Sequence, residues 1–240
     1  MTPETDKNID WKLGIALVLI VLAIVSVVYY ATHREITDPQ VLITKTIGAS
    51  EDITAYRFAL STNLSVPAEA VEMMSGEGSV DYTNKKLSTT MTMMNRSFEM
   101  IVINDTAYAR ESNGSWRTQE FDEQTLWKGY DQLEQQRALL QNATNVTMQK
   151  EDNGWILTVI PDQEEVIEQM QRTGLELTGE EELKDFTIVY WIEKGSYYIT
   201  KIENTIEVTM NIQGLVTPIE LNNSVTIYDY NKELEIEAPV

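Results

Sequence analysis

Residues able to perform catalysis are scarce in this chain. His33 is the single histidine, so neither a Ser-His-Asp triad nor a histidine metal cluster is available. Cysteine is absent, which removes disulfides, thiolate metal sites, cysteine nucleophiles and the lipidated cysteine of a bacterial lipoprotein. We therefore assign His33 to a solvated linker and expect no metal site.

Carboxylates are plentiful, with 38 Asp and Glu against 18 Lys and Arg and a net charge of -20. Glu164, Glu165 and Glu168 lie on one predicted helix, where such a run is typical of a solvated face. The glutamates at 180–182 lack the spacing of a calcium loop. A paired-carboxylate glycosidase stays open, because any acidic chain offers candidate pairs. We predict that the protein is not an enzyme, needs no cofactor, and binds no nucleic acid, whose phosphates its charge repels.

The elements that would position any site begin with an apolar segment, residues 13–32. It holds no charge and, at the rise of a helix, would span about 30 Å, the thickness of a bilayer core. Trp11 precedes it and Tyr30 lies near its end, as membrane interfaces favour. A secretory signal peptide is the alternative, but the preceding residues are not net positive and no small-residue cleavage site follows. The pattern predicts a transmembrane helix, with residues 1–12 as a cytoplasmic tail.

All Asn-X-Ser/Thr sequons follow this segment. They give candidate glycosylation sites at Asn63, Asn95, Asn104, Asn113, Asn142, Asn145 and Asn222. The charges flanking the apolar segment do not decide its orientation, so the sequons decide it. We expect a single-pass protein of the cell membrane with residues 33–37 as a linker and residues 38–240 as a β domain outside.

Hydrophobic periodicity predicts the elements of that domain. Asp38 followed by Pro39 predicts the start of a short helix. From Thr54 onward apolar and polar residues alternate, as in half-buried antiparallel strands. Helical spacing returns at 122–141 and 162–173. The expected fold class is α+β, in which the transmembrane helix is followed by a curved antiparallel sheet, a half-open barrel covered by helices.

The order of these segments resembles a known family. A helix and a strand precede the glycine-bent GEGSVDY strand, the KLSTTMTMM strand, the FEMIVINDTAYAR hairpin and SWRTQEF, and a helical insert and a second series of strands follow. The run is similar to the LolA/LolB-like lipoprotein-carrier superfamily and its LppX/LprG lipid-binding relatives, over roughly residues 38–235. This resemblance implies a concave apolar sheet that holds acyl chains or a lipidated protein's tail beneath a helical lid.

The resemblance also implies which side chains line such a cavity. The candidates are Tyr56, Phe58, Leu60, Met91, Met93, Phe98, Met100, Val102, Trp127, Tyr130 and Leu133. The alternative for each of them is a dry core packed against the lid helices. Methionine suits a cavity because its flexible side chain adapts to ligands of different shape.

The predicted function is a membrane-anchored lipid- or lipoprotein-binding protein of the cell envelope. Its partners would be the membrane, through the anchor helix, and a lipid or lipidated protein. A permanent anchor argues for a fixed acceptor, donor or sensor rather than a shuttle. The alternative is a non-catalytic cell-surface interaction or structural glycoprotein that docks an envelope protein and binds no small ligand.

Overall fold

The computed structural model describes residues 36–66, 69–94, 96–112, 114–120, 131–161, 182–212 and 215–239. From Asp38 onward the chain forms one compact unit, Asp38–Val240. The predicted transmembrane span 13–32 and the predicted helix 162–173 lie outside the described residues, as does the first half of the helix predicted at 122–141.

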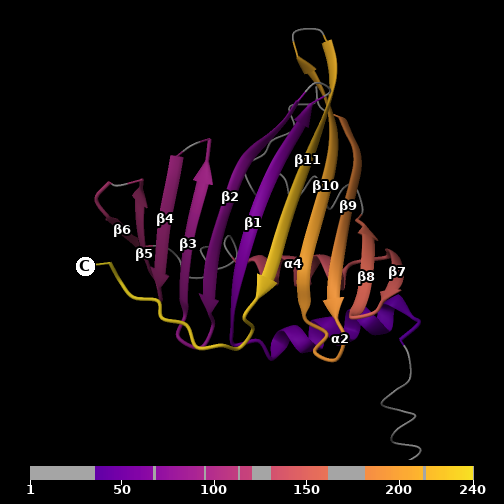
Figure 1. Ribbon diagram of the computed structural model, residues 1–240, viewed down its shortest axis with the longest axis horizontal. Coiled ribbons are helices and arrows are strands. Elements are labelled where there is room, and N and C mark those ends of the chain that lie inside the picture. The colour runs from indigo at the N-terminus through magenta and orange to yellow at the C-terminus, as the bar shows by residue number, and fades with distance from the viewer. Residues whose placement is uncertain are drawn as a thin grey trace, which may run out of the picture. The chain divides into compact units, whose positions relative to one another are not determined.

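One antiparallel sheet of 11 strands makes up most of this unit (Figure 1). Its strand order is β6-β5-β4-β3-β2-β1-β11-β10-β9-β8-β7. Two consecutive meanders, β1 to β6 and β7 to β11, are therefore joined in the middle by the pairing of β1 with β11. The strands are β1 Ala55–Val66, β2 Glu69–Asp81, β3 Lys86–Met93, β4 Arg96–Ile103, β5 Thr106–Glu111, β6 Arg117–Glu120, β7 Asn145–Glu151, β8 Gly154–Ile160, β9 Glu182–Glu193, β10 Ile199–Ile212 and β11 Leu215–Tyr228.

Two helices accompany the sheet in the described part of the chain. Helix α2, Pro39–Glu51, begins as its local sequence predicts: the Asp38 side chain accepts a hydrogen bond from the Gln40 backbone N–H at 2.9 Å, and proline occupies the first turn. Helix α4, Gln132–Gln141, begins in the same way at Asp131. The two helices pack against each other, and α2 also contacts β7.

The sheet has one apolar and one polar face, because side chains alternate along each strand. We call apolar face the one that carries Tyr56 of β1, Ile202 of β10 and Tyr190 of β9, all three fully buried. Tyr190 and Ile202 are direct partners on the neighbouring strands β9 and β10. Serine, threonine and charged side chains such as Lys201 occupy the opposite, polar face.

Gly78 shows why β2 carries glycine within its length. Gly78 is paired with Phe58 of β1, and a Cβ atom at this position would lie 2.4 Å from Cζ of the Phe58 ring and 2.7 Å from the Ser88 carbonyl oxygen. The missing side chain leaves space for the aromatic ring on the apolar face. The residue thus serves a close approach between neighbouring strands.

The fold class predicted from the sequence, a transmembrane helix followed by a half-open barrel covered by helices, is wrong. The described residues form a large, open antiparallel sheet, with β6 and β7 at its edges, and two short helices of 13 and 10 residues. Neither helix has the length and apolar character needed to cross a membrane. This finding contradicts the predicted single-pass localisation at the cell membrane.

The prediction that helices cover the sheet was wrong for a physical reason. Recurrence of apolar residues at helical spacing favours a local helix wherever it occurs. It does not report how much of a distant sheet that helix covers, because coverage depends on tertiary packing.

Candidate functional site

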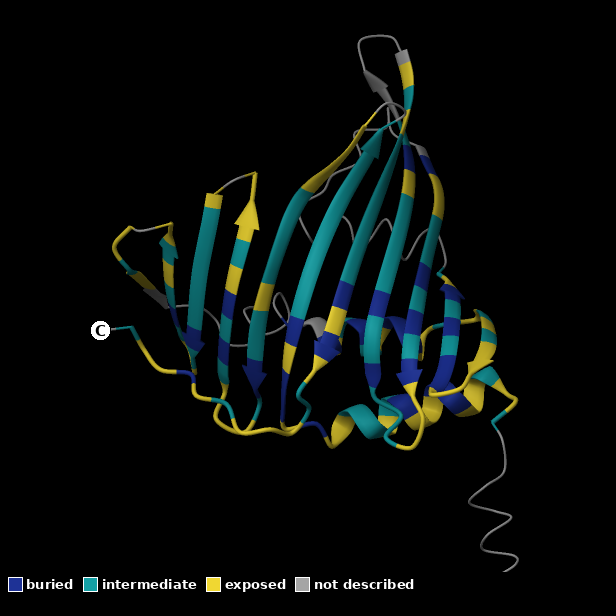
Figure 2. Cartoon of the chain, viewed as in Figure 1, coloured by how far each residue is buried: buried dark blue, intermediate teal, exposed yellow. Residues whose placement is uncertain are grey.

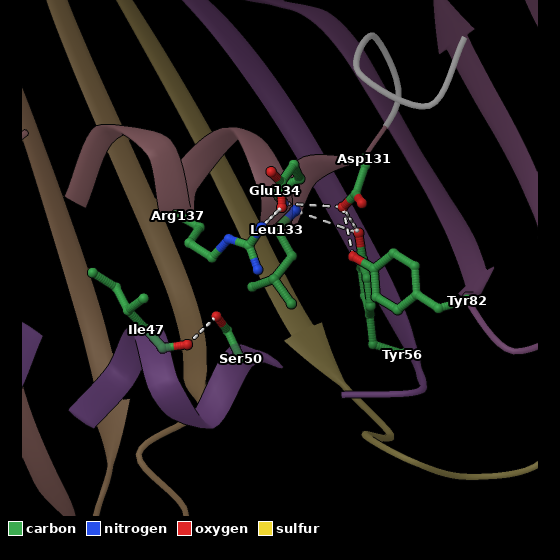
Figure 3. A network of polar contacts seen from close by, with 8 residues as sticks. All are labelled: Ile47, Ser50, Tyr56, Tyr82, Asp131, Leu133, Glu134 and Arg137. Atoms are coloured by element: carbon green, nitrogen blue, oxygen red, sulfur yellow. Dashed lines mark hydrogen bonds and ion pairs between the residues drawn. The ribbon is translucent and has the colours of Figure 1, made fainter. Parts of the chain in front are cut away.

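Helix α4 is attached to the apolar face at its N-terminus. Asp131, at the N-cap, uses Oδ1 to accept hydrogen bonds from the Glu134 backbone N–H at 3.1 Å and from two tyrosine hydroxyls, Tyr56 at 3.1 Å and Tyr82 at 2.8 Å. The Tyr56 hydroxyl also accepts from the Leu133 backbone N–H at 3.4 Å. Figure 3 shows both tyrosine rings converging on the carboxylate at the start of the helix. This cluster joins β1, β2 and α4.

A second attachment lies further along the same helix. The Tyr190 hydroxyl of β9 donates a hydrogen bond to Gln136 Oε1 at 3.0 Å, and Gln136 is itself buried. Leu133, Leu139 and Leu140 of the helix are also buried. Hydrogen bonds at two points hold α4 in register with the sheet, and its leucines are shielded from solvent.

Burial sets the charge states of these groups. It raises the pKa of the Asp131 carboxyl above its ordinary value, and this effect outweighs the hydrogen bonds from Glu134, Tyr82 and Tyr56, which lower it. Burial likewise raises the pKa of Tyr56, Tyr82 and Tyr190 well above the usual tyrosine range. The tyrosines therefore remain neutral donors and cannot act as general bases near neutral pH.

Asp131 should make the stability of the protein depend on pH. Because its pKa is raised on folding, its contribution to the free energy of unfolding is present below the ordinary aspartate pKa and is lost as pH rises through the raised value. Asp131→Asn keeps the acceptor oxygen and removes this titration. We expect the stability of the wild type relative to the variant to fall as pH increases.

Urea unfolding of both proteins at several pH values from about 4 to about 8 measures this difference. The comparison between variants removes the contribution of the other carboxylates. A difference that is constant with pH, or that grows as pH rises, would contradict the assignment.

Farther along β1 and β11 the apolar face continues with side chains that are half-buried, whereas Ile188 of β9 and Val208 of β10 are buried. Figure 2 shows buried residues gathered at the ends of the central strands nearest the two helices, and intermediate exposure along the rest of β1. We call open patch the half-buried apolar residues of this face. They are Leu60, Leu64, Met74, Met91, Phe98, Met100, Phe186, Ile206, Ile219 and Leu221.

The lining residues predicted from the sequence divide between these two regions. Tyr56, Phe58, Val102 and Leu133 are buried, as in a dry core. Leu60, Met91, Phe98 and Met100 belong to the open patch, with Met91 paired to Phe98. Met93 is 45% exposed at the end of β3. Trp127 and Tyr130 lie outside the described residues.

Sequence reasoning assigned Tyr56 to a cavity lining and missed the other residues that attach α4, which are Asp131, Tyr82, Gln136 and Tyr190. Asp131 followed three positions later by Glu134 is the pattern of a helix N-cap box, and it could have located the start of this helix. No sequence signal connects Asp131 with Tyr56, 75 positions away, or with Tyr82, 49 positions away.

A small pocket opens between the two helices beside the Asp131 cluster. Its volume is about 240 Å³, and its lining consists of Ser50, Glu51, Ile53, Tyr82, Leu133, Glu134 and Arg137. Arg137 forms an ion pair with Glu134 at 2.5 Å, which neutralises the guanidinium charge. The described residues include no cluster of three His, Cys, Asp or Glu side chains that could hold a metal ion.

The candidate glycosylation sites differ in accessibility. Asn104, Asn142 and Asn145 are exposed, and Asn63 is half-buried on the polar face. Asn222 is half-buried on the same face, where its amide donates to Glu220 and its carbonyl accepts from the Thr205 hydroxyl at 2.9 Å. Asn95 and Asn113 lie outside the described residues. Glycosylation at these positions remains a prediction.

Comparisons with known proteins identify the architecture. No protein-family model and no curated protein matches the chain. Among solved structures, lipoprotein LppX of Mycobacterium tuberculosis matches 84% of this chain and 100% of its own, with a TM-score of 0.53 and 16% identity. A DUF1329 family protein from Desulfovibrio piger and a LolA superfamily protein from Nitrosomonas europaea each match 83% of this chain and 96% of their own, at 10% identity and TM-scores of 0.31 and 0.30.

The match to LppX has an identity that shows the fold alone. The fold expected from the resemblance is confirmed: the chain has an LppX-like fold.

Proposed function

We propose that the protein binds a lipid, or the acyl chains of a lipidated protein, on the open patch. The observation that carries this proposal is the continuation of the apolar face beyond α4 with half-buried side chains. Apolar side chains that stay partly exposed over several neighbouring strands are typical of an interaction site. Each methylene group of an acyl chain buried there would contribute about 0.8 kcal/mol.

The composition of the open patch fits flexible apolar ligands. Met74, Met91 and Met100 lie on three neighbouring strands of the patch. Unbranched thioether side chains change rotamer at low cost and so adapt to chains of different length and curvature. The LppX-like fold supports the same class of ligand, because the family resemblance found in the sequence implies a concave sheet that holds acyl chains.

Native purification tests the proposal directly. We expect the full chain to retain lipid at near-stoichiometric amount, identified by extraction and mass spectrometry. A lipid-free protein that also takes up no lipid from mixed vesicles would contradict the proposal. It would favour the alternative of an interaction protein without a small ligand.

A pair of variants on β3 localises the site. Met91→Asp places a carboxylate in the open patch, where burial beneath an acyl chain costs several kcal/mol, and we expect it to reduce bound lipid by about tenfold or more. Thr92→Asp is the matched control, since Thr92 is the next residue and is exposed on the polar face. We expect it to retain lipid. Loss of lipid in both variants, or unfolding of Met91→Asp as judged by circular dichroism, would contradict this location.

A further inference from the structure

Three polar side chains form a row across the middle of the apolar face. Thr62 of β1 is paired directly with Asn223 of β11, and Asn223 with Asn204 of β10. The alternation that puts Tyr56 and Ile202 on the apolar face puts these residues on it as well. The Thr62 hydroxyl donates a hydrogen bond to Asn223 Oδ1 at 3.3 Å.

Apolar residues flank this polar row on both sides along the same strands. On the side nearer α4 the next row consists of Leu60, Val225 and Ile202. On the other side it consists of Leu64, Leu221 and Ile206. On these three strands a narrow polar row therefore separates two apolar regions, and the row ends against Met74 of β2 and Ile188 of β9.

Asn204 carries an unmet hydrogen-bonding group in this row. Its Oδ1 atom is buried and accepts no hydrogen bond from any residue that the structure describes. A buried acceptor without a donor costs about 1–3 kcal/mol. A bound molecule recovers that free energy if it displaces the side chains that cover the oxygen and donates a hydrogen bond to it.

We propose that the polar row recognises the hydroxyl group of an uncharged acyl lipid whose chains lie on the two apolar regions. The unpaired Asn204 Oδ1 requires a hydrogen-bond donor. An O–H group is the donor that neutral acyl lipids carry. The row itself consists of two amides and one hydroxyl and holds no charge, so it offers no counter-ion for a phosphate or an ammonium group. This inference rests on the proposed function and specifies the class of lipid.

The test compares two lipids that differ in a single donor. Dioleoylglycerol has a free hydroxyl, and its O-methyl ether has the same two chains and no O–H group. Displacement of a fluorescent fatty-acid probe from the full chain measures the affinity of each. We expect the wild type to bind dioleoylglycerol about tenfold more tightly, as one hydrogen bond to a buried acceptor predicts.

Variants assign the preference to the row. Asn204→Leu should bind both lipids with equal affinity, and Asn204→Ala serves the same purpose if leucine disturbs the sheet. Thr205→Val is the matched control, because Thr205 is the next residue on β10 and lies on the polar face. We expect it to keep the preference for dioleoylglycerol.

The outcomes separate this inference from the proposed function. Equal affinity of the wild type for both lipids would overturn the role of the row and leave lipid binding intact. Persistence of the preference in the Asn204 variants, or its loss in Thr205→Val, would also overturn it. Failure to bind either lipid, together with absence of co-purifying lipid, would overturn the proposed function and this inference with it.

Discussion

Gly154→Ala is expected to lower the free energy of unfolding by about 3 kcal/mol. Gly154 begins β8, is buried, and is paired with Glu193 of β9. A Cβ atom here would lie 1.9 Å from the backbone carbonyl oxygen of Ile192. That oxygen belongs to the neighbouring strand, so relief of the overlap requires movement of the β8–β9 pair. Urea unfolding of the full chain measures the change.

Gly48→Ala provides the control for Gly154→Ala. Gly48 lies in helix α2, and a Cβ atom there meets nothing within 4 Å. The substitution should stabilise the protein by about 0.5–1 kcal/mol, because alanine loses less conformational freedom in a helix than glycine does. Equal effects of the two substitutions would show that steric overlap at Gly154 is not the cause.

Tyr56→Ala is expected to lower the free energy of unfolding by about 4 kcal/mol, the usual cost of truncating a large buried aromatic side chain. Tyr56 has 0% exposure. Its ring lies 6.1 Å from that of Phe58 and 6.0 Å from that of Tyr82, centroid to centroid. The variant loses this packing and also the hydrogen bond that ties β1 to Asp131.

Tyr56→Phe separates the two contributions in the same urea experiment. It keeps the ring and removes the hydroxyl, which donates to Asp131 and accepts from the Leu133 backbone N–H. We expect a loss of about 1–2 kcal/mol. Equal losses for the phenylalanine and alanine variants would mean that ring packing contributes nothing. No loss for phenylalanine would mean that the attachment of α4 does not depend on this hydroxyl.

The start of α2 and the faces of the strands could be predicted from the sequence because they depend on neighbouring residues. Asp38 caps α2 through a residue two positions away, and the two-residue period of β1 sets the face of Phe58 and of Leu60. The order of these local signals was also sufficient to indicate the LppX-like fold. Local signals did not reveal the small share of helix in the described structure.

The candidate site depends on contacts between distant segments. Pairing of β1 with β11 sets Thr62 beside Asn223, 161 positions away, and creates the polar row. The Asp131 cluster likewise joins residues from two strands and a helix. Periodicity identifies a side chain as facing the apolar side and does not report what covers it there.

The amino-acid sequence by itself determined the alternation of the strands, the cap of α2 and the lack of a histidine cluster or a thiolate, since each follows from residue type and local spacing. The tertiary structure alone decided which apolar residues are buried beneath α4 and which remain in the open patch. Burial depends on the summed packing of segments far apart in the chain, and no local pattern encodes that sum.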